Sequence, residues 1–301
     1  LTLPPGRDGL LMKPQARAKQ PGAAVLKKER TDNTQRLPVT HKHSEIMQRI
    51  SVIGAGAWGT ALAQSLADAD REVLLWAREP EVVASINEKN ENTVFLPGVS
   101  LKPQITATES LTEAAAGDLI LLVTPAQHVR NTLGSLKGNL AEGKPVVICA
   151  KGIELESGLL MSQVADEVVS TEASIAILTG PTFASEIARG LPSAVTIAAR
   201  DKDVAQQIRD ALASRTIRPY VTDDMIGVQI GGAVKNVIAI ASGIVAGRGL
   251  GESARAALIT RGLAEMARLS AAMGGKKETL MGMCGVGDLI LTATSMQSRN
   301  Y

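Results

Sequence analysis

The sequence predicts an α/β fold in which a doubly wound domain is followed by an all-helical domain. Short apolar runs alternate with segments of helical spacing from about residue 50 onwards. The runs at 118–123 (DLILLV) and 145–149 (PVVIC) are apolar throughout, as in central parallel strands that are buried on both faces. After residue 222 the strand signals stop, and helical runs separated by glycines fill the rest of the chain.

The boundaries of the two domains follow from these signals. We expect a dinucleotide-binding domain over residues 47–222 and a helical substrate domain over residues 223–301. A helix is predicted over Thr60–Ala69. Further strands are predicted at Ile50–Ile53, Glu72–Trp76, Ile175–Leu178 and Ala194–Ala198.

Charge is unevenly placed along the 301 residues. The chain has a formal net charge of +2, but residues 1–50 alone carry ten Lys or Arg against four Asp or Glu. Residues 1–46 mix Pro, Gly, Lys and Arg without periodicity, and we interpret them as a disordered basic tail that precedes a natural start at Met47. An organelle transit peptide is the alternative. Because the basic charge lies in this tail, the pattern is not that of a nucleic-acid-binding protein.

Several classes of protein are disfavoured by composition. Cys149 and Cys284 cannot form a disulfide framework and are typical of a reducing compartment. The three histidines lie at no metal-ligand spacing, so no metal is expected. The stretch 226–246 is long and apolar, but Gln229 and Lys235 lie near its middle. It predicts a buried helix of a soluble protein rather than a membrane span.

The segment Gly54-Ala55-Gly56-Ala57-Trp58-Gly59 has the pattern G-x-G-x-x-G between a predicted strand and a predicted helix. In this context Gly54 permits a tight turn, Gly56 lets the backbone approach a pyrophosphate, and Gly59 allows close helix–strand packing. The helix N-terminus adds amide donors and a positive dipole. The motif therefore predicts a dinucleotide site, which Ala57 and Trp58 help to form, although Trp58 also fits a place in the core.

The second strand ends in an unusual residue for such a site. An acidic residue normally binds the ribose 2′-hydroxyl of NAD there, whereas Arg78 stands nineteen residues after Gly59. A guanidinium suits a 2′-phosphate, so NADP(H) is the expected cofactor. A solvated Arg78 paired with Glu79 or Glu81 is the alternative, and Glu79 leaves room for NAD(H).

Lys235 is the only charged residue between Asp224 and Arg248. Gly231 and Gly232 lie one helical turn before it and are expected to leave room beside its side chain. Desolvation of the ammonium should lower its pKa towards neutrality, as suits a group that donates a proton to an alkoxide and takes it back. A lysine that extends its ammonium to solvent is the alternative.

Seven segments then make the sequence familiar. They are GAGAWGT, AKGIE, GPTFASE, GVQIGGAVKNVIAIASG, ALITRGLAEM, GVGDLILTAT and QSRN. From about Ser51 to Asn300 they resemble, in order, the signatures of the bacterial-type NAD(P)-dependent glycerol-3-phosphate dehydrogenases. The resemblance implies NAD(P)H-dependent, reversible reduction of dihydroxyacetone phosphate to sn-glycerol 3-phosphate, which supplies phospholipid synthesis. We expect a cytoplasmic homodimer.

The resemblance also implies roles for individual residues. Lys235 becomes the general acid and base, Lys151 lies between cofactor and substrate, and Asp288 lies near the substrate hydroxyls, where it also holds Lys235. The resemblance assigns further residues to the substrate and to the cofactor. Gly180 and Thr182 contact the substrate, Ala184 touches the cofactor, Ser298, Arg299 and Asn300 hold the phosphate, and Arg299 also lies near the cofactor.

The sequence departs from the family pattern at both ends, and two other functional interpretations stay open. The family continues with further helices after QSRN, so the helical domain is expected to be truncated at Tyr301, and residues 1–46 have no counterpart in the family. A 3-hydroxyacid or 6-phosphogluconate-type dehydrogenase is one alternative, although QSRN has no counterpart there. The other is a nucleotide-binding module without catalysis.

Overall fold

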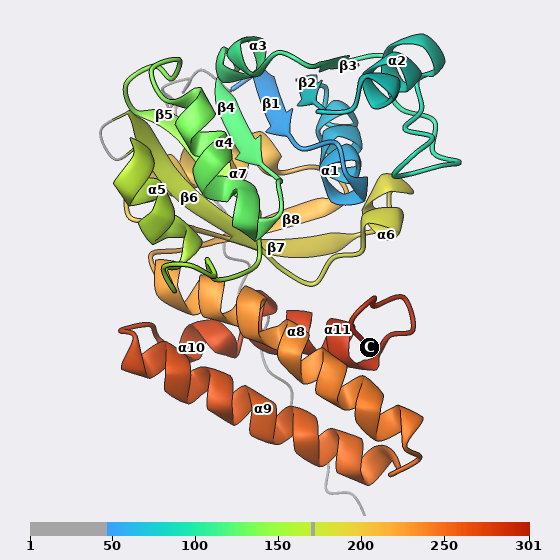
Figure 1. Cartoon of the computed structure of the whole chain (residues 1–301), viewed down its shortest axis with the longest axis vertical. Coiled ribbons are helices and arrows are strands. Elements are labelled where there is room, and N and C mark those ends of the chain that lie inside the picture. Colours follow the sequence, from blue (N-terminus) through green and yellow to red (C-terminus); the bar gives the residue numbers. More distant parts are fainter. Residues whose placement is uncertain (1–46, 170–171) are drawn as a thin grey trace, which may run out of the picture. The chain divides into compact units, whose positions relative to one another are not determined.

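The computed structural model describes residues 47–169 and 172–301. The predicted disordered tail, residues 1–46, lies outside this range, and its interpretation stays a prediction. The described residues form an eight-stranded sheet flanked by helices, and only helices follow the last strand (Figure 1). The predicted fold class, a doubly wound α/β part followed by a helical part, is confirmed.

The sheet is mainly parallel. Its strands are β1 Arg49–Ile53, β2 Glu72–Trp76, β3 Ile105–Thr108, β4 Leu119–Leu122, β5 Lys144–Ile148, β6 Ala173–Thr179, β7 Ser193–Ala199 and β8 Ile217–Thr222. They lie in the order β3-β2-β1-β4-β5-β6-β7-β8, and only the pairing of β7 with β6 is antiparallel. Because β1 and β4 are neighbours, the order reverses between them. The crevice outside the carboxyl ends of strands at such a switch point is where dinucleotides bind in this architecture.

Six of the eight strands lie where the apolar runs predicted them, but β3 and β8 were missed. Both are edge strands of the sheet. The sequence of β3 is ITAT and that of β8 is IRPYVT, so each mixes polar residues or proline with its apolar ones. Edge strands tolerate this composition because one side of their backbone needs no partner strand.

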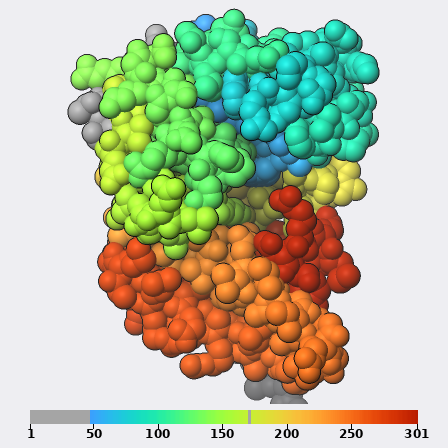
Figure 2. Space-filling view, viewed as in Figure 1, coloured from blue at the N-terminus to red at the C-terminus, as the bar shows by residue number. Residues whose placement is uncertain are grey.

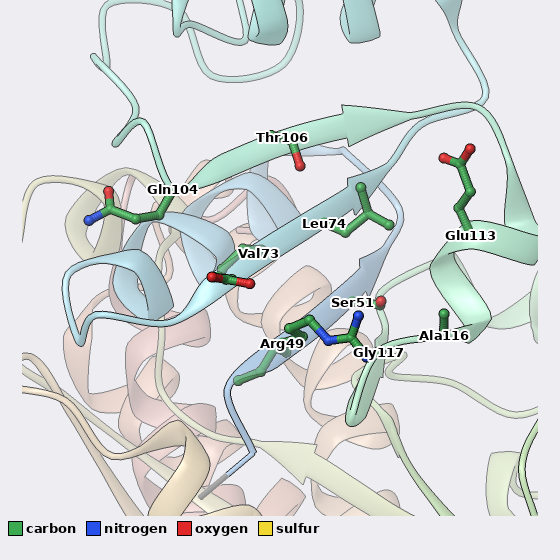
Figure 3. A pocket seen from close by; sticks show the side chains of 11 residues that line it. Arg49, Ser51, Val73, Leu74, Gln104, Thr106, Glu113, Ala116 and Gly117 are labelled. Atoms are coloured by element: carbon green, nitrogen blue, oxygen red, sulfur yellow. The ribbon is translucent and has the colours of Figure 1, made fainter.

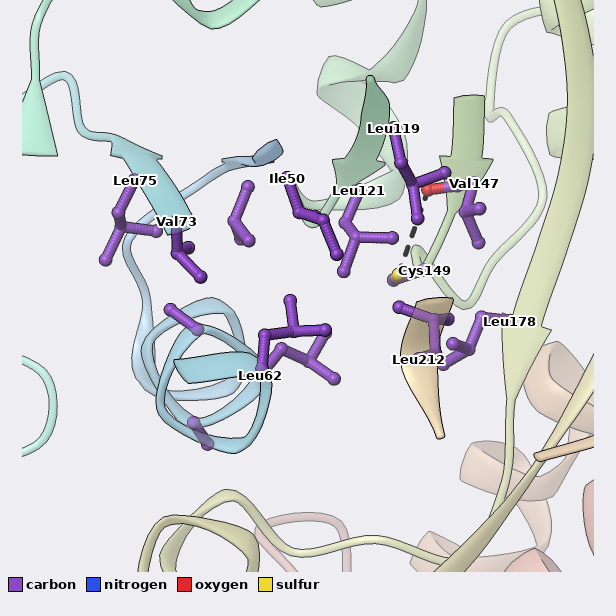
Figure 4. Packing of buried hydrophobic residues seen from close by; sticks show 14 of the residues in the cluster. Ile50, Leu62, Val73, Leu75, Leu119, Leu121, Val147, Cys149, Leu178 and Leu212 are labelled. Carbon is purple, nitrogen blue, oxygen red and sulfur yellow. Dashed lines mark hydrogen bonds between the residues drawn. The ribbon is translucent and has the colours of Figure 1, made fainter. Parts of the chain in front are cut away.

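Side chains alternate between the two faces of the sheet, and each face has its own apolar core. In β4, Leu119 and Leu121 belong to one core, while Ile120 and Leu122 belong to the other. Figure 4 shows part of the first core, with Leu62 packed beneath the strands. All four residues of β4 are fully buried, which explains why its sequence is apolar throughout.

The flanking helices supply the other side of each core. The face with Leu121 is covered by α1 Ala57–Ala67, α2 Pro80–Lys89, α6 Ala184–Ala188 and α7 Lys202–Leu212. The opposite face is covered by α3 Leu111–Ala115, α4 Val129–Leu136 and α5 Met161–Val169, and the 3₁₀ helix η1 Ala126–His128 leads into α4. The helix predicted over Thr60–Ala69 corresponds to α1, which begins three residues earlier.

A hollow of about 300 Å³ lies between the single-turn helix α3 and the first strands (Figure 3). Ser51, Leu74 and Thr106 line it from three neighbouring strands, and Glu113 lies on its other side. None of the predicted cofactor or substrate residues lines this hollow. It is therefore separate from the site described below.

The helical part begins with a capped helix. Its helices are α8 Met225–Gly247, α9 Glu252–Ala272, α10 Lys277–Leu280 and α11 Asp288–Thr294, with a π-helical turn, η2 Met283–Gly287, before α11. Asp224 accepts a hydrogen bond from the Gly227 amide at the start of α8, and its other oxygen accepts one from the Lys276 amide. One carboxylate thus satisfies a free amide of α8 and ties α8 to the loop before α10.

Among the described residues, α8 is the one helix whose length and composition would allow it to cross a membrane. Its apolar window has a mean hydropathy of 1.6 and is 39% buried. One face of α8 is buried with Gln229 and Lys235, while Val237 and Ile244 are exposed on the other. The sequence predicted a buried helix, whereas the structure leaves one face of α8 exposed. The expected absence of a membrane span stays a prediction.

Gly231 and Gly232 in α8 allow neighbouring segments to pack closely against the helix, and they do not leave empty space beside it. A Cβ atom at Gly231 would lie 2.3 Å from the carbonyl oxygen of Cys284 in η2. One at Gly232 would lie 3.1 Å from Thr179 Oγ1 and 3.4 Å from Lys151 Cγ. The expectation that these glycines leave room beside Lys235 was therefore wrong, because η2 and β6 occupy that space.

We predict that Gly231→Ala destabilises the protein by about 1–3 kcal/mol, since the added methyl group overpacks against backbone that cannot give way. Gly247→Ala is the matched control. It lies in the same helix, nothing lies within 4 Å of its added Cβ, and it should change stability by less than about 1 kcal/mol. Urea denaturation of both variants measures the difference. Equal unfolding midpoints would show that α8 does not approach η2 this closely.

Candidate active site

The glycine turn after β1 has a geometry that only glycines allow. Gly54 has φ of +118°, and a Cβ there would lie 3.0 Å from the carbonyl group of Val123. A Cβ at Gly59 would lie 1.9 Å from the oxygen of Gly54. By contrast, a Cβ at Gly56 would meet nothing within 4 Å. Gly54 and Gly59 therefore shape the turn, and Gly56 leaves its outer side open to a ligand.

The start of α1 fits the pyrophosphate of a dinucleotide. Gly56 caps α1 without any side-chain hydrogen bond, and Ala57 and Trp58 form its first turn. The free amides and the positive end of the helix dipole suit a doubly charged phosphate pair. The residues of this turn therefore fit the cofactor that the sequence motif predicts.

Asn92 fixes the turn through buried hydrogen bonds, and it was not predicted from the sequence. Its side chain is fully buried, and its amide nitrogen donates to the oxygen of Ala55 and to Thr60 Oγ1, both at 2.8 Å. Its own oxygen accepts from the Phe95 amide at 3.0 Å. A single asparagine 33 residues after Gly59 gives no local signal, because its partners come together only in the fold.

Two further predicted cofactor residues, Arg78 and Ala184, lie on neighbouring elements, and Trp58 lies in the turn itself. Arg78 follows β2, with its side chain 79% exposed and 3.1 Å from Glu79 Oε1, which is the pairing that the alternative interpretation named. Trp58 is partly buried against the core. Ala184 begins α6, which packs against α1. Arg78 and Ala184 therefore follow or begin elements that neighbour β1 and α1, and Trp58 is part of the turn itself.

The predicted chemistry residues meet in one buried group, the lysine–carboxylate cluster of Lys151, Lys235 and Asp288. Lys235 Nζ donates to Asp288 Oδ1, and Lys151 Nζ donates to Asp288 Oδ2 at 2.7 Å. The Asp288 side chain is 1% exposed, that of Lys235 is 7% exposed and that of Lys151 is 22% exposed. Two ammonium groups thus share one carboxylate, away from bulk water.

The pKa of Lys235 is low for a lysine. Burial lowers it first, and the positive charge of Lys151 lowers it further, while Asp288 opposes both. The result is a pKa of about 8 against the usual 10.5. Lys235 is therefore a group that can both hold and release a proton near neutral pH. It does not extend its ammonium to solvent, which removes the alternative considered from the sequence.

Three separate segments bring the cluster together. Lys235 comes from α8, Asp288 begins α11 directly after the π-helical turn η2, and Lys151 follows β5. Lys151 Nζ also donates to the oxygen of Gly180 at 3.1 Å. A Cβ at Gly180 would lie 2.7 Å from the oxygen of Ala194, so glycine is needed where β6 ends against β7.

The other predicted substrate residues lie around the cluster without joining it. Thr182 Oγ1 donates to the oxygen of Gly180 at 3.4 Å. Asn300 Nδ2 donates at 3.0 Å to Asn236 Oδ1, on the residue next to Lys235. Ser298 and Arg299 make no side-chain contact with the cluster, and Arg299 forms no ion pair with any other described residue. In Figure 2 this C-terminal segment, in dark red, lies at the surface beside the helices.

Thr292 is a cluster contact that the sequence analysis missed. Its Oγ1 accepts a hydrogen bond from Lys235 Nζ at 3.0 Å. It stands four residues after Asp288 on α11, so both side chains lie on one face of that helix. Its position four residues after Asp288 is the one sequence signal that could have indicated Thr292.

The glycine turn at the switch point and the buried lysine–carboxylate cluster together fit one class of protein, the nicotinamide-dependent dehydrogenases. Two sequence families match the chain. The one described as NAD-dependent glycerol-3-phosphate dehydrogenase N-terminus matches residues 49–205, and its C-terminal counterpart matches residues 224–301. The chain belongs to the NAD-dependent glycerol-3-phosphate dehydrogenase family.

Curated relatives and solved structures agree with this assignment. The glycerol-3-phosphate dehydrogenase [NAD(P)+] of Parvibaculum lavamentivorans is 56% identical over 253 residues, covering 84% of this chain and 76% of the relative. That of Paramagnetospirillum magneticum is 56% identical over 256 residues, covering 85% and 92%. The crystal structure of glycerol-3-phosphate dehydrogenase from Coxiella burnetii aligns with a TM-score of 0.80 at 38% identity, covering 85% of this chain and 78% of that one.

We predict that Gly59→Ala weakens NADPH binding at least about tenfold, because the added methyl group forces the turn at Gly54 out of its phosphate-binding geometry. Gly134→Ala is the control, since this glycine is exposed in α4 and nothing lies within 4 Å of its added Cβ. Titration of NADPH fluorescence with each variant gives the dissociation constants. An unchanged constant for Gly59→Ala would place the cofactor elsewhere.

Proposed function

We propose that this chain catalyses the reversible, NAD(P)H-dependent reduction of dihydroxyacetone phosphate to sn-glycerol 3-phosphate, a precursor of glycerophospholipids. The observation that supports this most strongly is Lys235, a buried lysine of lowered pKa bonded to Asp288, in a chain of this dehydrogenase family. The substrate in this proposal is inferred from the name of the relatives. The proton transfer that the reaction needs is inferred from the geometry of the cluster.

Gly54, Gly56, Ala57, Trp58 and Gly59 hold the cofactor in this proposal. When bound, the nicotinamide ring supplies the hydride to C2 of the substrate and takes it up again in the reverse reaction. The Gly56 side of the turn leaves space for the pyrophosphate, and the first amides of α1 donate to it. Ala184 and Arg299 complete the cofactor site.

Lys235 holds the proton that the reaction exchanges. In reduction, its ammonium group stabilises the negative charge that develops on the C2 oxygen and donates a proton to it. In oxidation, the neutral amine accepts the proton from the C2 hydroxyl. A pKa of about 8 leaves both protonation states populated near neutral pH.

Asp288 and Lys151 set the position and the charge of Lys235. The carboxylate fixes the Lys235 ammonium by a charge-assisted hydrogen bond and keeps some of its protonated form. Lys151 lowers the pKa of Lys235 through like-charge repulsion and, in the proposal, faces both cofactor and substrate. Gly180 and Thr182 line the substrate beside Lys151.

Ser298, Arg299 and Asn300 hold the phosphate end of the substrate in this proposal. A guanidinium binds phosphate through two parallel hydrogen bonds, and Arg299 has no ionic partner among the described residues that would compete. Asn300 is already fixed next to Lys235 through Asn236. This contact supports the assignment, because it holds Asn300 against the residue next to Lys235 in the middle of α8.

We further propose that residues 47–222 form the dinucleotide-binding domain and residues 223–301 the substrate domain.

A cytoplasmic location is supported by two buried cysteines, Cys149 and Cys284, which remain as free thiols. The expected homodimer stays a prediction.

The central prediction concerns the lysine. Lys235→Ala should still bind NADPH but lose at least about a hundredfold in kcat, since general acid–base assistance contributes about 10²–10⁴ in rate. Lys235→Arg should not restore the rate, because guanidinium does not release its proton near neutral pH. Steady-state kinetics with dihydroxyacetone phosphate, together with NADPH titration, measures both effects.

The pH dependence of the wild-type rates provides an independent check on the role of Lys235. Reduction needs the protonated lysine, so its rate should fall as the pH rises through about 8, whereas the rate of glycerol 3-phosphate oxidation should rise there. Near-normal turnover by Lys235→Ala would remove the lysine from the mechanism. It would leave the carboxylate cluster with a structural role alone.

A preference for NADP(H) over NAD(H) rests on Arg78. Its exposed guanidinium contacts only Glu79 among the described residues, so it is free to turn towards a 2′-phosphate. We predict that the wild type uses NADPH better than NADH and that Arg78→Asp lowers this preference about tenfold. The ratio of kcat/KM for the two cofactors measures it. A wild type that favours NADH would overturn the role given to Arg78.

A further inference from the structure

The loop that carries Lys151 folds back on itself directly after β5. Ile153 forms an isolated antiparallel bridge with Leu160, and the Glu154 amide donates to the oxygen of Leu159 at 2.9 Å. The Gly158 amide donates to the oxygen of Glu154 at 2.9 Å, and Gly158 has φ of +70°. The segment 151–160, which we name the Lys151 loop, is therefore a closed turn.

Glu154 anchors this loop to α4. It is 8% exposed, and its carboxylate accepts two hydrogen bonds from Arg130, Nε to Oε1 at 2.9 Å and Nη2 to Oε2 at 2.8 Å. Ser157 Oγ, from within the loop, donates to the same carboxylate. The Arg130 guanidinium first and the Ser157 hydroxyl second lower the pKa of Glu154 to about 2, so it stays ionised at any pH where the protein works.

A second contact holds the loop to η1. The side chain of Gln127 donates to the oxygen of Ile153 at 2.9 Å and accepts from the amide of Leu155 at 3.0 Å. A Cβ at Gly152 would lie 2.7 Å from Ala126 Cβ, so the residue next to Lys151 packs directly against η1. The loop is thus fixed on both sides of Glu154 to the segment that follows β4.

The Lys151 ammonium lies close in sequence to these contacts. It reaches Asp288 Oδ2 at 2.7 Å and the oxygen of Gly180 at 3.1 Å, and only the short stretch up to Glu154 separates it from the anchor. Neither Arg130 nor Glu154 contacts Lys235 or Asp288 itself. A role in the reaction would therefore have to pass through Lys151.

We propose that Glu154 and Arg130 are positioning residues that hold the Lys151 loop, and through it place Lys151 against Asp288 for substrate binding. The inference rests on the proposed function for its kinetic part only. The position of Lys151 is a structural property that can be measured without turnover. Loss of the anchor should free the Lys151 ammonium from Asp288 and leave the glycine turn unaffected.

The test compares Glu154→Gln with Glu167→Gln. Glu167 on α5 also accepts from Arg130 Nη2, at 2.7 Å, but it makes no contact with the loop, so its loss removes a carboxylate from the same arginine. We expect Glu154→Gln to raise the KM for dihydroxyacetone phosphate about tenfold and to weaken NADPH binding less than this, because the glycine turn keeps its contacts with the cofactor. Glu167→Gln should change both constants less than about twofold.

A chemical measurement separates positioning from activity. Brief labelling with isotopic acetic anhydride, followed by peptide mass spectrometry, reports how freely the Lys151 amine reacts. We expect labelling of Lys151 to rise at least about threefold in Glu154→Gln and to stay at the wild-type level in Glu167→Gln. If none of the proteins reduces dihydroxyacetone phosphate but Lys151 labelling still rises in Glu154→Gln, the proposed function fails and the positioning role stands.

Arg130→Lys keeps the charge but loses the two-point contact, and it serves if Glu154→Gln does not fold. It should also raise both Lys151 labelling and KM. Wild-type labelling of Lys151 in a folded Glu154→Gln or Arg130→Lys variant would overturn the proposal, even with a lowered melting temperature. That outcome would reduce the anchor to a contribution to stability.

Discussion

Two lysine ammonium groups converge on the carboxylate of Asp288, and much of the structure serves to bury these three charges together. An unpaired carboxylate at 1% exposure would carry a desolvation cost of several kcal/mol, so the carboxylate needs a cationic partner, and here it has two. One partner, Lys151, follows a strand of the parallel sheet, and the other, Lys235, lies on the first helix beyond it. The cluster is therefore also a contact that holds the sheet and the helical part in a fixed arrangement.

Close backbone packing makes this burial possible. Gly232 lets α8 pass within contact distance of the Lys151 side chain, and Gly231 lets it approach η2, which ends directly before Asp288. The π-helical turn η2 lies directly before Asp288, and such turns are frequent at functional sites. The same low-dielectric surroundings that make these charges costly also lower the pKa of Lys235, so packing and chemistry share one cause.

The parts of the fold and the site that could be predicted from the sequence are those in which a local structural requirement leaves a local residue pattern. Buried central strands are apolar on both faces, and the turn at Gly54 and Gly59 excludes side chains, so both leave a signature. Edge strands β3 and β8 leave none. Asn92 and Thr292 were missed because their partners come from distant segments, and Gly231 was misread because the sequence does not say what lies against it. A single lysine among apolar residues did point to Lys235, since an isolated buried charge has few structural uses.

The central claim is that Lys235 titrates near neutral pH within the cluster, and its ionisation can be measured directly. NMR of protein labelled with ¹⁵N and ¹³C at lysine, with the Lys235 signal assigned from the Lys235→Arg variant, follows the side chain through a pH titration. The account predicts a pKa of about 8 for Lys235, well below the 10.5 of an ordinary lysine. A pKa of 10.5 or above would contradict it, because Lys235 would then be a permanent cation paired with Asp288 and unable to exchange a proton with the substrate.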